Sequence, residues 1–516
     1  MFPVCFRFQV SHSQFSARLH LKLHRQFEYF LPSVSEYQLN IDSSITSCGF
    51  TPSCNDKNYT SLFIDGVAVK SGNILNKNTS STDKVEVVVV AEDGVTSKTY
   101  TININSIDSF SSADLSGLIL CWDTDTTQQF DVLEALEKSD SPIYYLRPDI
   151  AGIKVLATPL NGNASVYVNG TKIANGTHSD SIALSKDEDT EIVVKVVSQD
   201  NASEKSFTTT CRYYGTVWEK VGTMLVRPFN HQVVYHNNKF CMTAYTNDYS
   251  NYGWWTSPDG KSWSYHGAFN EEFDVLSHEG ASAILNNTIY TVGGFAYNAS
   301  IGDYEISPLI VTSTSGTLYN KYFATSGLTD GITESALVAF NNKLYLLGGC
   351  IDSDWGVVND IWTSTDGLTW TKGTTPAWGA RGGHAATIYN NKIYIAGGAY
   401  NNGDSERRDV WSSSNGTTWT QNTSSAAWTG RNDFTLSATS YGMFLVAGND
   451  GTFCNDVWFS HDGTNWICVT EAAAFSGRAA HQACIKDGYI YIFGGAADWD
   501  DASYDKDDVW RTYVGE

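Results

Sequence analysis

A set of Arg, His and acidic side chains recurs once per repeat in the second half of the chain. Guanidinium and imidazole groups can hold an anionic or hydroxyl-rich molecule through charge-assisted hydrogen bonds, and a carboxyl group beside them can transfer a proton. These residue types in a ring predict a binding site for a polar ligand. The candidates are Arg227, His231, His278, Glu334, Arg381, His384, Arg431, Asp433, Arg478 and His481.

Aromatic residues are expected on the same side of the molecule, in the long segments that separate the repeated motifs. Exposed aromatic rings beside Asp, Asn and Arg suit sugar stacking or a protein interface. The candidates are Tyr297, Trp355, Tyr400 and Trp499. The Asp-rich run from 498 to 508 has carboxylates that calcium prefers, but its spacing fits no calcium loop. We therefore predict no metal site and no cofactor.

The elements that position these residues are repeats of about 50 residues. Gly pairs end apolar runs, as at Gly348-Gly349 and Gly397-Gly398, and pairs of tryptophans eight residues apart follow in phase. Asn-Asn-Lys and Asp-Gly or Asn-Gly turns separate alternating apolar runs. The latter is a strong signal for a tight hairpin with positive φ at both central residues. Each repeat thus predicts four antiparallel strands, the blade of a β-propeller.

The ends of the repeat array predict how the ring closes. The last repeat contains Asp508-Val509-Trp510 but stops at Glu516, before its fourth strand. A Trp-bearing strand at 216–222 precedes the first repeat and has no repeat of its own. We expect it to supply the outer strand of the last blade, which removes two open sheet edges. The sequence therefore predicts six blades over residues 215–516.

These motifs resemble the kelch repeat. The resemblance rests on Arg-x-x-His, Gly-Gly and Asp-Val-Trp in order, as in Arg381 to His384, Gly397-Gly398 and Asp409 to Trp411. It implies that the repeated Arg and His often tie neighbouring blades together. Alternatively, six-bladed kelch proteins include periplasmic sialic-acid mutarotases. That resemblance would make Glu334 the proton-transfer group and give the sugar carboxylate a clamp of Arg381, Arg431 and Arg478. Glu334 and Asp433 stand where Arg or His would be expected.

A second self-similarity precedes the propeller. The segment 61–72 matches 165–176, and 89–101 matches 196–208. Two copies of an all-β module of about 100 residues are predicted, at 31–107 and 108–214. The pattern resembles the cadherin-like β-sandwich. Neither copy shows a catalytic constellation, and Cys121 and Cys211 could either form a disulfide bond or be buried free thiols. Cys48 and Cys54 could close a small loop.

Composition limits the function. Acidic residues outnumber Lys and Arg by 56 to 33, which excludes a nucleic-acid partner because a phosphate backbone needs clustered cations. The sequence contains no run of 18 apolar residues, so it predicts no transmembrane helix. Residues 1–30 are basic and acid-poor, and they form a leader or an unstructured segment without a clear signal peptide.

The sequence thus predicts an all-β protein, a six-bladed kelch-type propeller after two Ig-like or cadherin-like β-sandwiches. We expect a binding or adhesion protein, secreted, on the cell surface or in the periplasm, whose long-loop face binds a glycan or a protein. Function concentrates on variable loops held by a rigid scaffold. A carbohydrate-processing enzyme similar to a sialic-acid mutarotase is the alternative, but the absence of a recognisable catalytic motif favours a non-enzymatic role.

Overall fold

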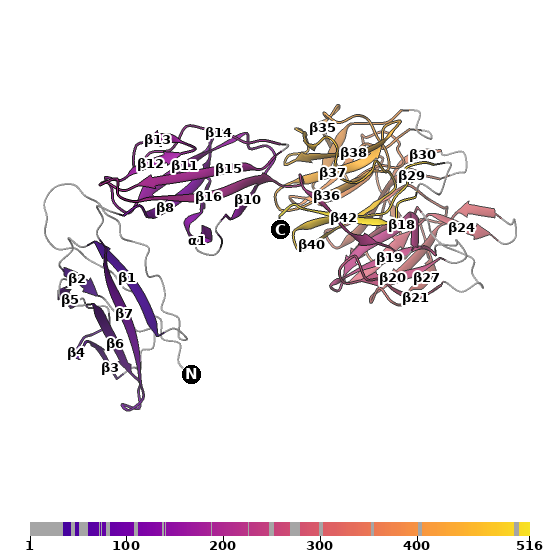
Figure 1. The fold of residues 1–516 in the computed structure, drawn as a ribbon. Coiled ribbons are helices and arrows are strands. Elements are labelled where there is room, and N and C mark those ends of the chain that lie inside the picture. Colours follow the sequence, from indigo (N-terminus) through magenta and orange to yellow (C-terminus); the bar gives the residue numbers. More distant parts are fainter. Residues whose placement is uncertain are drawn as a thin grey trace. The chain divides into compact units, whose positions relative to one another are not determined.

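The computed structural model describes residues 35–515, with gaps. The gaps are 43–46, 51–59, 72, 74, 79–82, 108–111, 137–138, 140, 187, 225, 247–251, 269–278, 299–302, 352–355, 401–404 and 500–504. The predicted leader at 1–30, His278 and Trp355 lie outside the described residues, as does Cys54. The predicted all-β fold class is confirmed, since the described part contains one short helix, α1 (Leu133–Leu136), among many strands (Figure 1).

The first sandwich contains a five-stranded sheet in the order β1-β7-β6-β3-β4. Alternating side chains of its strands are buried, and Leu62, Ile64, Val85, Val87 and Tyr100 form the centre of the core. The strands are β1 (Glu36–Asp42), β7 (Ser97–Ile107), β6 (Lys84–Val90), β3 (Ser61–Ile64) and β4 (Val67–Ala68), and the second sheet pairs β2 (Ser47–Phe50) with β5 (Leu75–Asn78).

The second sandwich repeats this topology, with a parallel edge pair followed by antiparallel strands. Cys121 and Cys211 are both buried free thiols, so the disulfide alternative is wrong for this pair. One sheet has the order β10 (Ile143–Leu146), β16 (Glu204–Tyr213), β15 (Thr190–Val197), β12 (Ser165–Val168), β13 (Thr171–Ile173). The other has the order β14 (Ile182–Ala183), β11 (Gly152–Pro159), β8 (Leu115–Trp122), β9 (Gln129–Asp131).

The remaining described residues include six four-stranded antiparallel sheets. We number these blades one to six in chain order. From the inner to the outer strand, blade one is β18 (Val226–His236), β19 (Lys239–Thr246), β20 (Tyr252–Ser257), β21 (Ser264–Ala268). Blade two is β22 (Ala281–Leu285), β23 (Thr288–Val292), β26 (Leu309–Ser313), β27 (Asn320–Phe323), with the small hairpin β24 (Phe295–Asn298) and β25 (Asp303–Ile306) between its second and third strands. Blade three is β28 (Ala336–Phe340), β29 (Lys343–Cys350), β30 (Val357–Ser364), β31 (Thr371–Lys372).

The last three blades follow the same order. Blade four is β32 (Ala385–Tyr389), β33 (Lys392–Ala396), β34 (Val410–Ser413), β35 (Thr420–Thr423). Blade five is β36 (Thr435–Ala438), β37 (Met443–Asn449), β38 (Phe453–Ser460), β39 (Ile467–Thr470). Blade six is β40 (Gln482–Lys486), β41 (Tyr489–Phe493), β42 (Asp508–Tyr513) and, from the front of the array, β17 (Trp218–Thr223).

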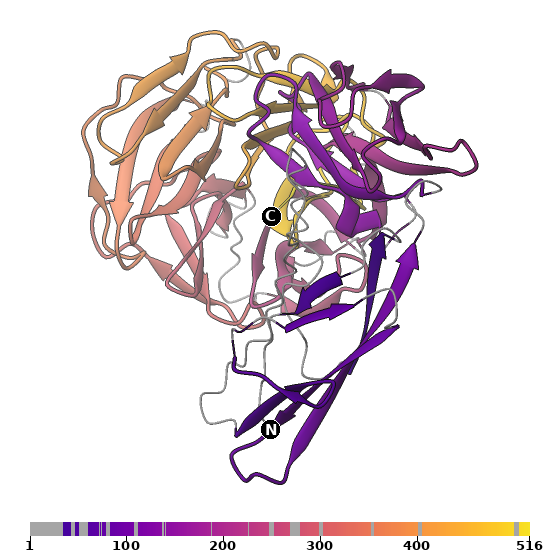
Figure 2. The same cartoon turned by 90° about the vertical axis from the view of Figure 1, so that its left-hand side faces the viewer.

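The inner strands surround a central channel. Each contacts the inner strand of the blade before it and of the blade after it, and β40 of blade six contacts both β36 and β18. Figure 2 shows the sheets succeeding one another around this ring. Strand β17 pairs antiparallel with β42, with Trp218 opposite Thr512, so blade six joins strands from both ends of the array.

Two kinds of turn hold each blade, and they work differently. In the Asn-Asn turns both residues have positive φ, for example Asn390 at 45° and Asn391 at 55°, as a tight hairpin requires. At Asp487-Gly488, between β40 and β41, both residues also have positive φ, as predicted. In the Asp-Gly and Asn-Gly turns between third and fourth strands, as at Asp366-Gly367, only the Gly has positive φ, so the predicted hairpin geometry is wrong there. Instead, Asp366 Oδ1 accepts hydrogen bonds from the amides of Leu368 and Thr369 at 2.8 and 2.7 Å. The acidic side chain therefore replaces the backbone bond of the turn.

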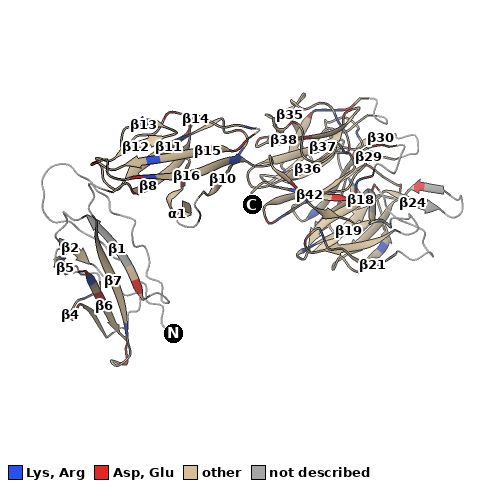
Figure 3. Cartoon of the chain, in the orientation of Figure 1, with Lys and Arg blue, Asp and Glu red and all other residues tan. Residues whose placement is uncertain are grey.

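Charged positions are sparse along the strands of each part (Figure 3). Within the described ranges no helix is long and apolar enough to cross a membrane.

Candidate binding site in the propeller channel

The channel between the inner strands contains a cavity of about 1010 Å³. Its walls carry polar side chains from several blades, including Gln232, Ser282, Thr435, Ser437 and Gln482. The inner strand of a blade starts where its second strand ends, because the two are antiparallel. The long loops after the second strands therefore lie at the same end of the channel as the residues that precede the inner strands.

We call this end the channel mouth. The residues just before the inner strands bring three carboxyl groups and one amide to it, the end of β37 adds a second amide, and the long loops add one further carboxyl group and one aromatic ring. They are Glu279, Glu334, Glu406, Asn432, Asp433, Asn449 and Trp499, all of which line the cavity.

A chain of backbone hydrogen bonds passes from blade to blade around the mouth. The amide of Glu334 donates to the carbonyl of Glu279 at 3.3 Å, Gly383 to Glu334 at 3.1 Å, Asp433 to Gly383 at 2.8 Å and Ala480 to Asp433 at 2.9 Å. All five residues have positive φ, between 48° and 64°. That conformation is uncommon for residues with a side chain. It occurs here in five consecutive blades because the backbone of each of these residues is hydrogen-bonded to the equivalent residue of the blade before it, of the blade after it, or of both.

The carboxyl groups of Glu334 and Asp433 lie close to the backbone of blade four. A Cβ atom at Gly382 would stand 2.6 Å from Glu334 Oε2, and a Cβ atom at Gly383 would stand 2.9 Å from Asp433 Oδ1. These two glycines therefore leave room for the acids of blades three and five.

Each of the three acids has a polar neighbour that donates to it. The Cys350 thiol donates to Glu334 Oε2 at 3.2 Å, the Thr333 hydroxyl to Glu279 Oε2 at 3.2 Å and the Asn432 amide to Asp433 Oδ2 at 3.0 Å. None of these donors carries a positive charge. They orient the carboxyl groups without neutralising them.

Burial raises the pKa of Glu334 to about 7, and the nearby Glu279 carboxylate adds to the shift. Burial also raises the pKa of Asp433 well above its usual range, and the charges of Glu334 and Glu279 act in the same direction. The pKa of the Cys350 thiol is raised first by burial, and the charges of Glu334, Glu279 and Asp433 add to that shift. Near neutral pH Asp433, and Glu334 in part, thus keep protons that the same groups would have lost in water.

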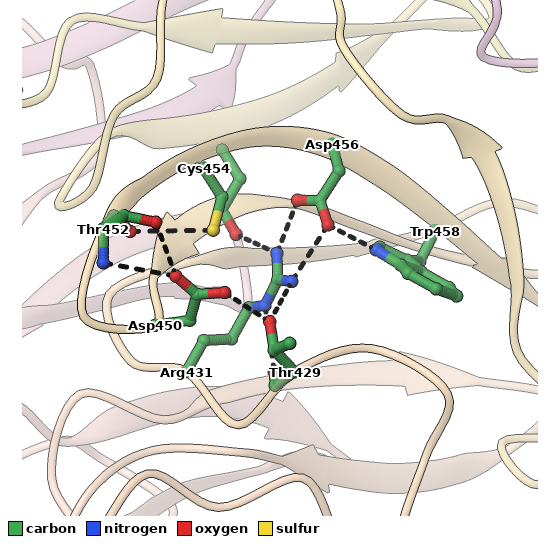
Figure 4. Close-up of polar contacts among 8 residues, drawn as sticks. Thr429, Arg431, Asp450, Thr452, Cys454, Asp456 and Trp458 are labelled. Atoms are coloured by element: carbon green, nitrogen blue, oxygen red, sulfur yellow. Dashed lines mark hydrogen bonds and ion pairs between the residues drawn. The ribbon is translucent and has the colours of Figure 1, made fainter.

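The predicted arginine clamp does not face the channel. Arg431 is 1% exposed, and its Nη1 and Nη2 donate to the two carboxylate oxygens of Asp456 at 2.6 and 2.9 Å. Its remaining donors reach the carbonyl of Ala447 and the backbone and hydroxyl of Thr429. Asp456 in turn accepts from the indole of Trp458 at 2.7 Å (Figure 4).

The same arrangement recurs in blades four and six. Arg381 binds Asp409, and Arg478 binds Asp508, each through both carboxylate oxygens and with a fully buried guanidinium group. A ligand in the channel would have to displace an aspartate to reach any of the three. They are ties within a blade, between its inner and third strands, which corrects both the clamp hypothesis and the expectation that they link neighbouring blades.

Neighbouring blades are linked by a different group, the Gly pairs. The second amide of each pair donates to the carbonyl at the Arg position of the next blade, as from Gly398 to Arg431 at 2.9 Å and from Gly448 to Arg478 at 2.9 Å. The third and fourth blades use Gly349 and Arg381 in the same way.

The predicted histidines supply no charge to the channel either. His384 and His481 are 6% and 2% exposed, and burial lowers the pKa of His384 to about 3 and that of His481 well below its usual value. Both imidazoles are therefore neutral. His231 is fully buried. Arg227 lies in β18 and Tyr297 in β24, where the structure describes the backbone alone.

The aromatic candidates separate in space. Trp499 is 46% exposed at the channel mouth, with its ring centroid 5.2 Å from that of Phe453. Tyr400 is equally exposed but lines a smaller pocket with Arg407, Arg408 and Glu406, of which Glu406 also lines the channel cavity. The structure thus brings Glu334, Asp433 and Trp499 together and leaves Tyr400 apart.

Two features of the mouth differ from the sequence prediction. Glu279 and Cys350 were missed, and Glu334 and Asp433 were assigned to the wrong repeat position. The hydrogen-bond series shows that they occupy the position of Gly383 and Ala480, two residues after the repeated Arg. Aligning every repeat on this position would have found Glu279, because it directly follows His278.

Comparisons with known proteins agree with this architecture. Residues 283–495 match the model of the KLHDC2/KLHL20/DRC7 Kelch-repeats domain, and residues 16–106 and 146–212 match that of the cadherin-like beta sandwich domain. The solved structure of YjhT is similar, with 13% identity and a TM-score of 0.47 over 56% of this chain and 95% of that chain. No curated protein matches the chain.

The chain is therefore an all-β protein with a kelch-type propeller. More particularly, it carries a kelch-repeat domain preceded by cadherin-like β-sandwich sequence, and both predicted resemblances are confirmed. This combination of domains supports a protein-binding or adhesion role.

Proposed function

We propose that this protein is an adhesion or binding protein of the cell surface or envelope, and that its propeller binds a segment of another protein at the channel mouth. The observation that supports this best is the cavity itself. It is large enough for several side chains, and its mouth presents amides, carboxyl groups and one exposed tryptophan from at least four blades. Concave sites of this size with a few convergent polar groups are typical of binding sites.

The charge of the mouth narrows the ligand class. The described residues there include four acids and no exposed Arg or Lys, because the repeated arginines are bound to aspartates. An anionic sugar such as a sialic acid would meet unfavourable charge and no clamp. A basic side chain, Lys or Arg, would find carboxyl oxygens as hydrogen-bond acceptors and the face of Trp499. We therefore favour a protein segment that carries such a residue.

A selection from a random peptide library on the immobilised full-length chain tests this proposal. We expect enriched peptides to contain Lys or Arg and to lose about tenfold or more in affinity for the Trp499→Ala, Glu406→Gln double variant, since exposed rim contacts of this kind contribute on the order of 1–2 kcal/mol. Tyr322→Ala, which removes a similarly exposed ring from the outer strand β27, is the matched control. We call the Trp499→Ala, Glu406→Gln double variant the rim variant. Peptides that bind it with the same affinity as the wild type would place the site elsewhere.

A glycan array run beside the library separates the two ligand classes that the fold allows. Neutral glycans retained by the wild type and lost by the rim variant would replace the protein ligand with a sugar. Retention of sialylated glycans would contradict the charge argument directly.

A carbohydrate-processing enzyme is the second candidate, and the raised pKa of Glu334 favours it. A carboxyl group with a pKa near 7 in a cavity is suited to general acid and base catalysis at neutral pH. Since no arginine is available, the substrate would be a neutral sugar. On this candidate we expect accelerated anomer exchange in NMR spectra of neutral hexoses, abolished by Glu334→Gln. Exchange at the uncatalysed rate for both neutral sugars and sialic acid removes the enzymatic function.

A further inference from the structure

The three acids of the mouth come from different blades but share one environment. Glu279 precedes β22, Glu334 precedes β28 and Asp433 precedes β36. They are joined through the backbone bonds at Glu279, Glu334, Gly383 and Asp433, and all three act on the thiol of Cys350. A change of charge on one acid is therefore felt by the others and by three blades of the ring.

The elements packed against these acids supply no described positive charge to offset ionisation. Strand β29 contributes the Cys350 thiol, and the loop before β34 contributes the Glu406 carboxyl group. The inner strands and their leading residues contribute His231, His384 and His481, of which the latter two are neutral. Arg381, in the loop between β31 and β32, is held by Asp409.

We propose that Glu334 and Asp433, which stand beside the Glu279 carboxyl group, form a proton-controlled switch at the channel mouth that holds a basic side chain weakly when the two groups are protonated and strongly when they are ionised. This regulation rests on the function proposed above, because it concerns the same mouth and the same cationic ligand. Entry of the ligand drives protons off the acids, and loss of protons at higher pH favours entry. The two effects are one linkage seen from either side.

The switch also has a mechanical side. Ionised carboxyl groups that share a site repel one another. Here they stand on the series of backbone bonds that joins the blades, with Glu334 close to the α-carbon of Gly382 and Asp433 close to that of Gly383. Ionisation therefore adds electrostatic repulsion where backbone hydrogen bonds join neighbouring blades, and a bound cation reduces that repulsion.

The first test needs no ligand. In the full-length chain with ¹³C-labelled Glu and Asp side chains, we expect the Glu334 carboxyl signal to titrate near pH 7 and the Asp433 signal to titrate well above the other aspartates. The signals are assigned by their loss in Glu334→Gln and Asp433→Asn. Ordinary titration of both groups, near pH 4, overturns the switch.

The second test uses spermine, a small polyamine, as the probe. Calorimetric titration at pH 6 and pH 8 in 150 mM salt should show binding at least about tenfold tighter at pH 8, the change expected over two pH units when each bound spermine releases roughly half a proton or more. The Glu334→Gln, Asp433→Asn double variant should show less than about twofold change. A double variant with the same loss of charge at exposed sites, Asp330→Asn and Glu471→Gln, should keep the full effect.

The outcomes separate the switch from the function on which it rests. Raised titration with pH-dependent spermine binding but no enriched peptide supports the switch and contradicts the protein ligand. Enriched basic peptides whose affinity is the same at pH 6 and pH 8 support the ligand and overturn the switch. If the double variant fails to fold, the carboxyl titration of the wild type and the two single variants still shows whether Glu334 and Asp433 titrate at raised pH.

Discussion

Replacing Arg431 with alanine is expected to lower the free energy of unfolding of the propeller by about 3–5 kcal/mol. The guanidinium group is 1% exposed and makes bonds to Asp456, Ala447 and Thr429. Its removal leaves the Asp456 carboxylate and the Ala447 carbonyl with unpaired lone pairs in a mostly buried region. The cost is that of the uncompensated groups, which exceeds the net contribution of the pair itself.

Tryptophan fluorescence during denaturant unfolding measures this loss. Trp122 is the single tryptophan before residue 215 among the 16 in the chain, so the signal reports on the propeller almost alone. Arg408→Ala is the matched control, because that side chain is exposed in the neighbouring blade, and we expect a change within about 0.5 kcal/mol. A loss below about 1 kcal/mol for Arg431→Ala would mean that Asp456 reaches water when its partner is absent.

The local part of the fold could be predicted because its signals lie within a few residues. Asn390-Asn391 and the other Asn pairs specify hairpins through their own backbone preferences, and the Gly pairs mark where a second strand ends. The return of the chain from 216–222 to blade six was a deduction from a missing strand. The turn at Asp366-Gly367 was misread because two mechanisms share one dipeptide, and only the structure shows that the side chain accepts the bonds.

The roles of the charged residues could not be predicted, because each depends on a partner that is distant in sequence. Arg381 is bound by Asp409 and Arg478 by Asp508, 28 and 30 residues further on. The motif names both members but does not say that they meet. Glu279 shares the environment of Glu334 and Asp433, although the three acids come from three different blades. A ring of Arg and His was visible in the sequence, while the ring of carboxyl groups appears only when the repeats are placed side by side.

Replacing Glu334 with glutamine is expected to stabilise the propeller at pH 8 by about 3 kcal/mol and to change little at pH 4.5. The usual pKa of 4.5 is raised to about 7 in the folded protein. Between pH 4.5 and pH 7, the folded state therefore keeps a proton on Glu334 that the unfolded state has lost. Wild-type stability is highest below about pH 4.5 with respect to this group and falls as the pH rises through 7. Gln keeps the shape of the protonated acid and never ionises, so its difference from the wild type grows over the same window.

The measurement is the denaturant midpoint of the tryptophan transition from pH 4.5 to pH 8, taken as the difference between variant and wild type so that other acids cancel. Asp433→Asn should shift in the same direction, because burial and the same neighbours raise its pKa. The double variant should be stabilised by less than the sum of the two single effects, because the charge on each acid opposes ionisation of the other. Glu471→Gln, at an exposed position, is the matched control for the loss of one carboxyl group. A Glu334→Gln difference that is constant with pH would show that Glu334 ionises as freely in the channel as in water.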